Sequence, residues 1–162
     1  MLLNCTAPLG KEGVLSVEGS EGIRLPNDMY LKYPNLRRII KDDGKTEIVY
    51  DTKQGKSIVP TRIYGGKLIE NICQALARIV IGDQLIMIAK KYPVVMTVHD
   101  AVAALVRKKD IWDGLQFVDS CMKFTPSWAE GLPLSCELGY GLSYADAGNK
   151  KSITLHKHDF SK

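Results

Sequence analysis

The sequence predicts an α+β protein with antiparallel sheet, one long helix and a short hairpin. Three blocks of pattern lead to this fold class. Short β-branched runs separated by turn residues fill residues 21–63, apolar residues at helical spacing fill 66–91, and two short strands follow in 92–106. We therefore expect a β meander, then a long helix, then a hairpin.

Composition is that of a soluble globular protein. The chain has 162 residues, of which 45% are hydrophobic and 25% charged, so it suits one ordinary domain with a real core. The formal net charge of +4 permits a polyanionic partner without requiring one. No signal peptide is visible, and the most apolar region, residues 79–88, contains Asp83 and Gln84 and is too short to span a bilayer. We expect a cytoplasmic protein without a membrane partner.

The four cysteines give no sign of a metal site. None of them has a neighbour at metal-ligand spacing, and we expect reduced, mostly buried thiols. They are Cys5, Cys73, Cys121 and Cys136.

The first 63 residues divide into a loop-rich start and a meander. Residues 1–20 are rich in glycine and predict a loop-rich N-terminal segment. Residues 26–28 (Pro-Asn-Asp) and 42–44 (Asp-Asp-Gly) are typical turns between short strands. The last strand, residues 57–63, belongs at a sheet edge because Pro60 has no N–H to donate.

The long helix carries a polar row. Pro93 ends it, and Gly82 inside it is expected to weaken or bend it. Asn71, Gln74 and Arg78 are spaced by three and four residues, which places them on one face. This row is either an ordinary exposed stripe or a set of hydrogen-bonding groups that faces a ligand.

The hairpin has a polar pair at its turn. Apolar side chains flank His99 and Asp100 on both sides, so we expect most of the hairpin to be buried. A carboxylate near apolar surroundings usually has a hydrogen-bond partner, a cation or a metal. Asp is also common in turns, and this stretch alone favours a simple turn residue.

The C-terminal third predicts one more helix and one more strand. Residues 110–124 have helical spacing with Asp110 as N-cap, and Thr125-Pro126 ends them. Residues 134–144 predict a strand broken by Gly139 and Gly141, and residues 146–162 a polar tail.

Three stretches together resemble the bacteriophage-type family A DNA polymerases, relatives of bacterial DNA polymerase I. Residues 64–78 (YGGKLIENICQALAR) resemble the helix before motif C, and Val98-His99-Asp100 resembles motif C itself. Order and spacing agree over roughly residues 20–145. The resemblance implies that residues 21–145 are the C-terminal segment of a polymerase palm. The C-terminal matches are Pro126, Trp128-Ala129, residues 131–134, Glu137, Gly141 and Tyr144.

The family assigns roles to the matching residues. By resemblance, Asp100 is a ligand of magnesium (Mg2+) in a two-metal site, whose second aspartate is not in this chain, and His99 positions the primer terminus. Gln74, with Asn71 and Arg78, lines the DNA minor groove. The implied partners are primer–template DNA, deoxynucleoside triphosphates and the missing N-terminal part of the polymerase.

The sequence also departs from the family pattern. Ala101 stands where the family usually has Glu, and Glu70 occupies the position of an expected asparagine. No stretch resembles motif A. Lys56 has the spacing of the motif B lysine, but Thr52 replaces the arginine and Pro60 would break that helix.

We therefore expect the C-terminal fragment of a bacteriophage-type polymerase, located in the cytoplasm of a bacterial host cell. We expect that this fragment alone does not polymerise. The alternative is a nonenzymatic DNA-binding or interaction fragment of a degenerate or split prophage polymerase. A more distant alternative is a metal-dependent hydrolase that uses His156, His158 and Asp159.

Overall fold

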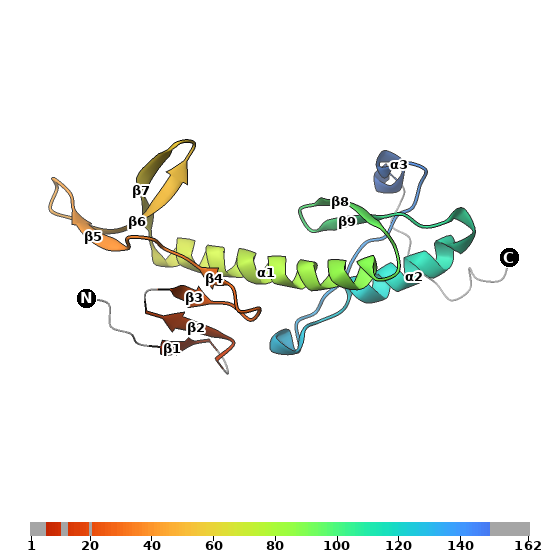
Figure 1. Cartoon of the computed structure of the whole chain (residues 1–162), viewed down its shortest axis with the longest axis horizontal. Helices are drawn as coiled ribbons and strands as arrows, with labels where there is room; N and C mark the ends of the chain where they lie inside the picture. The colour runs from red at the N-terminus through yellow and green to blue at the C-terminus, as the bar shows by residue number, and fades with distance from the viewer. Residues whose placement is uncertain (1–5, 11–12, 20, 150–162) are drawn as a thin grey trace. The chain divides into compact units, whose positions relative to one another are not determined.

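A computed structural model of the chain describes residues 6–10, 13–19 and 21–149 (Figure 1). It confirms the predicted α+β class, with antiparallel sheets and a long helix. The chain forms two compact units, Met1–Ala77 and Arg78–Lys162. The long helix α1 (Gly65–Ala89) contributes residues to both units.

The first unit begins with a four-stranded antiparallel meander. Within residues 1–20, which the sequence predicts to be loop-rich, the structure describes two short strands. Gly10 and Gly13 have φ angles of +82° and +68°, so they belong to the connection between these strands. Leu15, Ile23 and Leu25 are buried and form the core of this sheet. The strands are β1 (Thr6–Leu9), β2 (Leu15–Glu18), β3 (Gly22–Arg24) and β4 (Tyr30–Leu31).

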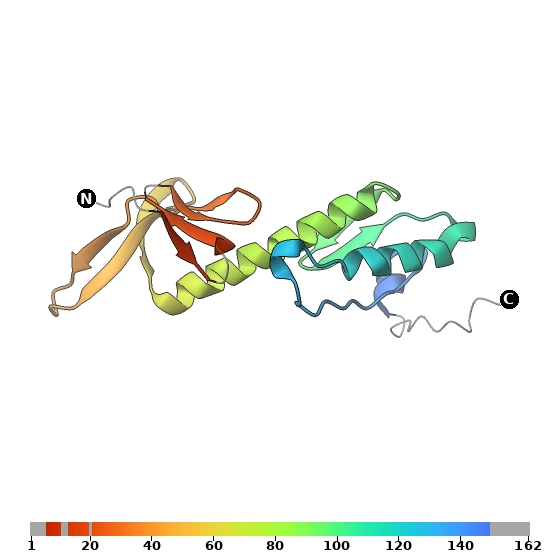
Figure 2. The same ribbon diagram turned by 90° about the horizontal axis from the view of Figure 1, so that it is seen from below.

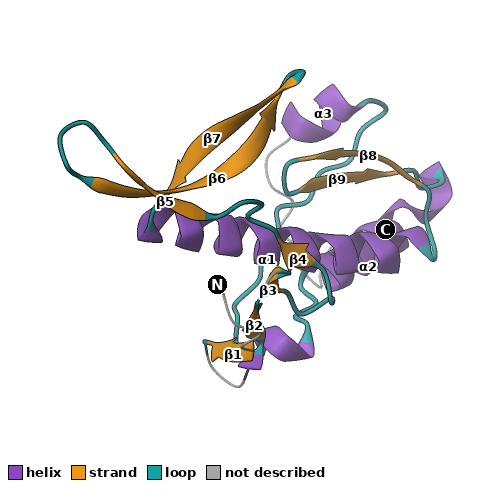
Figure 3. Ribbon diagram, turned by 60° about the vertical axis from the view of Figure 1, so that its left-hand side comes forward, coloured by secondary structure: helices purple, strands orange, loops and turns teal. Residues whose placement is uncertain are grey.

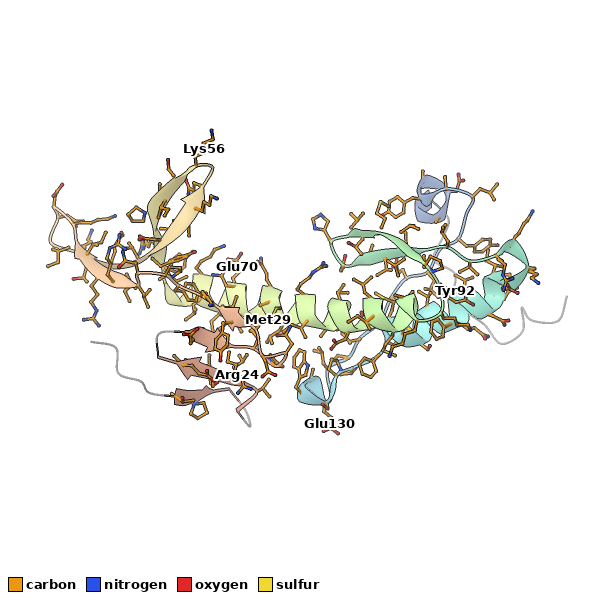
Figure 4. The ribbon with its side chains drawn as sticks, in the orientation of Figure 1. Arg24, Met29, Lys56, Glu70, Tyr92 and Glu130 are labelled. Carbon is orange, nitrogen blue, oxygen red and sulfur yellow. The ribbon has the colours of Figure 1, made fainter. Side chains whose placement is uncertain are left out.

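A second, three-stranded sheet follows in the same unit. Its strands are β5 (Arg37–Ile40), β6 (Thr46–Gln54) and β7 (Ser57–Ile63), in that order and antiparallel. Pro60 lies on β7 opposite Asp51, which confirms the predicted edge strand. Lys56 stands at the tip of the β6–β7 hairpin (Figure 4).

Helix α1 matches its predicted bounds to within two residues. Its buried side chains include Ile72, Ile79 and Ile88, and Gly82 does not interrupt it. The Ile88 carbonyl accepts hydrogen bonds from the N–H groups of Lys91 and Tyr92 at 3.0 and 2.9 Å, and Pro93 follows at once. α1 is also long and apolar enough to meet a length-and-composition criterion for crossing a membrane, which core helices of soluble proteins meet too.

The second unit combines the end of α1 with a hairpin and a second helix. The hairpin consists of β8 (Val94–Val98) and β9 (Ala101–Ala104), and it lies beside the C-terminal half of α1 and α2 (Ile111–Met122) (Figures 1 and 2). Asp110 occupies the N-cap position of α2 as predicted. Its carboxylate pairs with Arg107 at 3.1 Å instead of capping the helix.

A buried glutamine joins α1 to α2. The side chain of Gln84 is 1% exposed, and its Nε2 donates to the carbonyls of Met122 and Phe124 at 2.8 and 3.2 Å. These carbonyls lie at the C-terminal end of α2, where the helix itself offers no donor. Tyr92 packs edge-to-face on Phe117, with ring centroids 5.7 Å apart.

The predicted strand over residues 134–144 was wrong. After the short turn η3 (Ser127–Ala129) the chain runs as a loop to α3 (Tyr144–Asn149), seen in teal and purple in Figure 3. A Cβ on Gly139 would lie 2.2 Å from the Ala147 carbonyl oxygen, so this glycine makes room for α3. The predicted polar tail therefore begins with a helix. His156, His158 and Asp159 lie outside the described residues.

Candidate functional site

The turn between β8 and β9 consists of His99 and Asp100. Val98 pairs with Ala101 across the hairpin, so these two residues form the whole loop. His99 has a φ angle of +53°, which puts it in the left-handed region, and Asp100 does not share that conformation. Histidine tolerates this region better than β-branched residues do. The turn presents both polar side chains at the tip of the hairpin.

The hairpin is more exposed than its sequence predicted. Val95, Met96 and Val98 are 57%, 38% and 39% exposed, and no residue of β8 or β9 is buried, so the expectation of a mostly buried hairpin was wrong. Both faces of β8 carry apolar residues, a pattern typical of a strand buried on two sides. In the structure these apolar side chains of β8 are instead left exposed.

Asp100 is exposed and has no hydrogen-bond or salt-bridge partner in the part of the chain that the structure describes. Its carboxylate oxygens are therefore free to bind a cation from solution. Among residues 6–10, 13–19 and 21–149, no group of three or more metal-binding side chains lies close enough to hold an ion. Magnesium keeps several waters and takes one or two protein carboxylates, so Asp100 fits as one ligand of an incomplete set.

The predicted polar row lies on α1, and two of its members are held by neighbours. Asn71 Nδ2 donates to the Tyr33 hydroxyl at 3.1 Å, and Gln74 Nε2 donates to Glu70 Oε1 at 3.2 Å. Asn71 is half-buried and Gln74 is exposed. Arg78, also exposed, has no partner among the described side chains. The row is thus partly hydrogen-bonded within the protein, and whether it faces a ligand stays a prediction.

The acceptors of these two amides, Tyr33 and Glu70, were not predicted from the sequence. Glu70 binds Lys67 through both carboxylate oxygens at 3.0 Å, and this carboxylate raises the pKa of the Lys67 ammonium group. The spacing of Lys67, Glu70 and Gln74 by three and four residues was a readable signal for this chain of contacts. Tyr33 had no such signal, since it is far from Asn71 in the sequence.

Positive charge remains available on the second sheet. Its acidic residues are mostly neutralised, because Glu47 pairs with Lys41 and Arg62 at 2.9 and 3.3 Å, and Asp51 pairs with Arg37 at 2.8 Å. The exposed basic side chains without a partner in the described part of this sheet are Arg38, Lys53 and Lys56. Such side chains are available to a polyanion.

Comparison with known proteins gives one informative relative. The DNA polymerase of Bacillus phage SP02 is 34% identical over 119 residues, which cover 71% of this chain and 18% of that polymerase. No protein-family model matches the sequence, and no solved structure matches it. The chain is therefore related to a phage DNA polymerase and spans less than a fifth of that relative's length.

Proposed function

We propose that this chain is the C-terminal palm part of a family A DNA-directed DNA polymerase, which carries out template-directed nucleotidyl transfer in the cytoplasm of a bacterial host. One observation carries the proposal. In a chain related to a phage DNA polymerase, His99 and Asp100 stand together at an exposed hairpin tip, in the stretch that resembles motif C.

In this proposal Asp100 supplies one carboxylate to a two-magnesium site, and a second aspartate comes from a part of the polymerase that does not match this chain. The bound magnesium ions would lower the barrier by activating the primer 3′ hydroxyl and stabilising the leaving group. Asp100 has no competing partner among the described residues, so its oxygens are ready to bind. His99, its neighbour in the turn, would hold the primer terminus.

The polar row on α1 would face the DNA minor groove. Every base pair presents acceptors there, so an amide donor can test pairing geometry without reading sequence. Gln74 is exposed and keeps one N–H free after its bond to Glu70. Arg78 and the unpaired basic residues of the second sheet would hold phosphates, with salt-dependent affinity. The substrates would be primer–template DNA and deoxynucleoside triphosphates.

The exposed apolar side chains of β8 support a further part of the proposal. Val95 and Val98 are exposed, although apolar residues on both faces are typical of a strand in the middle of a layered structure. We expect the rest of the palm to cover these side chains. The N-terminal part of the polymerase would then be the partner that completes both the fold and the metal site.

A nonenzymatic DNA-binding fragment is the second candidate. Ala101 favours it, because this first residue of β9 replaces the acidic residue that follows the motif C aspartate in the resembling family. This candidate predicts salt-dependent DNA binding without any incorporation of nucleotides.

Primer extension separates the two candidates. The assay uses magnesium and all four nucleotides, with this chain alone and with the chain joined to the coding sequence that precedes it. Extension by the longer protein alone supports the polymerase. DNA binding by both proteins without extension supports the nonenzymatic fragment, and Ala101→Glu is then the first change to test for restored activity.

A further inference from the structure

We propose that Tyr33 is a positioning residue for the minor-groove row, in that its hydroxyl fixes the orientation of the Asn71 amide. The inference rests on the proposed function. It goes further because it assigns a role to a side chain that lies on a loop after β4, outside all the stretches that resemble the polymerase motifs.

The contact joins two distant parts of the first unit. Asn71 Nδ2 donates to the Tyr33 hydroxyl oxygen at 3.1 Å, across 38 residues of sequence. Both side chains are half-buried, so the bond is partly protected from water. The Tyr33 ring is itself held in place, because it packs edge-to-face on Tyr50 of β6 with centroids 5.0 Å apart and planes at 79°.

The contact with Tyr33 leaves part of the hydrogen-bonding capacity of the Asn71 amide available to a ligand. A carboxamide has two N–H donors and one carbonyl acceptor, and its two flipped orientations have nearly the same shape. A tyrosine hydroxyl can accept from an N–H or donate to a carbonyl, so the Tyr33 contact fixes the position of the amide, here with Nδ2 toward the hydroxyl. The second N–H remains free to donate, which matters because the minor groove presents acceptors at every base pair.

The side-chain amide of Gln74 is likewise held by a hydrogen bond within the protein. Its Nε2 donates to Glu70, one turn earlier on α1 (Figure 4 labels Glu70). Both predicted groove-facing amides are therefore held through one N–H and keep the other. An amide that is already oriented loses less conformational freedom when it binds DNA.

Binding of this chain to primer–template duplexes, measured by fluorescence anisotropy, tests the inference. The duplexes differ only in carrying 3-deazaguanine, which lacks the minor-groove acceptor N3, at successive positions. The proteins are the wild type, Asn71→Ala, Tyr33→Phe and the control Tyr92→Phe, which deletes a hydroxyl from an edge-to-face pair in the second unit.

We expect 3-deazaguanine to weaken wild-type binding about five-fold at one position, the effect of one lost neutral hydrogen bond. Asn71→Ala should abolish this penalty, Tyr33→Phe should reduce it to less than about two-fold, and Tyr92→Phe should keep it. The slope of affinity against salt should not change with Tyr33→Phe, because no charge is lost.

The outcomes that overturn the inference differ from those that overturn the proposed function. If Tyr33→Phe weakens binding to all duplexes equally and keeps the full penalty, Tyr33 has only a structural role. If Asn71→Ala abolishes the penalty but Tyr33→Phe changes neither the affinity nor the penalty, the hydrogen bond from Asn71 to Tyr33 has no role in positioning the amide. If the wild type shows no penalty at any position, Asn71 does not face the minor groove, and that part of the proposed function fails as well.

Discussion

Gly114 of α2 gives the sharpest test of how the second unit is packed. It is buried in the first turns of the helix, and a Cβ built on it would lie 2.7 and 2.9 Å from the two γ-methyl carbons of Val106. These distances are well below van der Waals contact. Valine is stiff about its χ1 angle, so Val106 cannot easily turn away. Gly114→Ala should therefore lower stability, although alanine is the better helix former.

The size of the effect follows from two opposing contributions. Overpacking a close-packed site costs about 1 to 3 kcal/mol, and the higher helix propensity of alanine returns up to about 1 kcal/mol. Taking the middle of the first range and the full gain, we expect a net loss of about 1 kcal/mol, or a fall in melting temperature of about 4 to 8 °C for a unit of this size.

Thermal unfolding followed by circular dichroism measures this effect. Gly82→Ala is the matched control, since no atom lies within 4 Å of a Cβ built on Gly82 inside α1. It should raise stability by about 0.5 to 1 kcal/mol. In a Val106→Ala background, Gly114→Ala should no longer destabilise. An equal loss in both backgrounds would refute the proposed collision with Val106.

Two further predictions concern titratable groups. Hydrogen bonds from Asn35 and Arg37, at 2.9 and 2.8 Å, lower the pKa of the Asp51 carboxyl. These bonds therefore stabilise the folded state at pH values above the pKa of Asp51 in the unfolded chain. The stabilisation is lost as the pH falls through the lower pKa of the folded state. Asp51→Asn should thus reduce the free energy of unfolding at pH 7 and make that free energy fall less when the pH is lowered. If urea titrations of this variant show the same dependence on pH as the wild type, the role given to Asp51 is wrong. Burial and the Asp119 carboxylate raise the pKa of the Cys136 thiol to about 11, whereas Cys73 is exposed. Iodoacetamide at pH 8 should alkylate Cys73 well before Cys136, as measured by mass spectrometry of the peptides, and equal rates would be inconsistent with this structure.

The regular elements were predictable because their signals are local. α1 has apolar residues at helical spacing and a proline after its end, and β7 has a proline that fits only an edge. The two-residue turn at His99 and Asp100 could be placed from the apolar runs around it. Each of these features depends on neighbours in the sequence, which a single chain supplies.

The wrong or missed predictions concern residues whose structural role is set by contacts with residues far away in the sequence. A glycine at position 139 is as compatible with a broken strand as with a loop that makes room for α3. Only the close approach of Ala147 shows that the loop is correct, and the sequence does not reveal that contact. The tether from Tyr33 to Asn71 spans 38 residues and has no local pattern. The exposure of β8 depends on what covers it, which the apolar runs of the hairpin do not specify.

The central claim is that Asp100 binds a catalytic metal ion of a DNA polymerase. The most direct measurement is primer extension by this chain joined to the coding sequence that precedes it, comparing wild type, Asp100→Asn and Asp42→Asn. Asp42 is the matched control, because it is also an exposed turn aspartate without a partner among the described residues. Both substitutions should change stability by less than about 0.5 kcal/mol. We expect Asp100→Asn to lower incorporation at least about 1,000-fold and Asp42→Asn to leave it unchanged, since a catalytic metal contributes several kcal/mol. Incorporation retained by Asp100→Asn would contradict the claim.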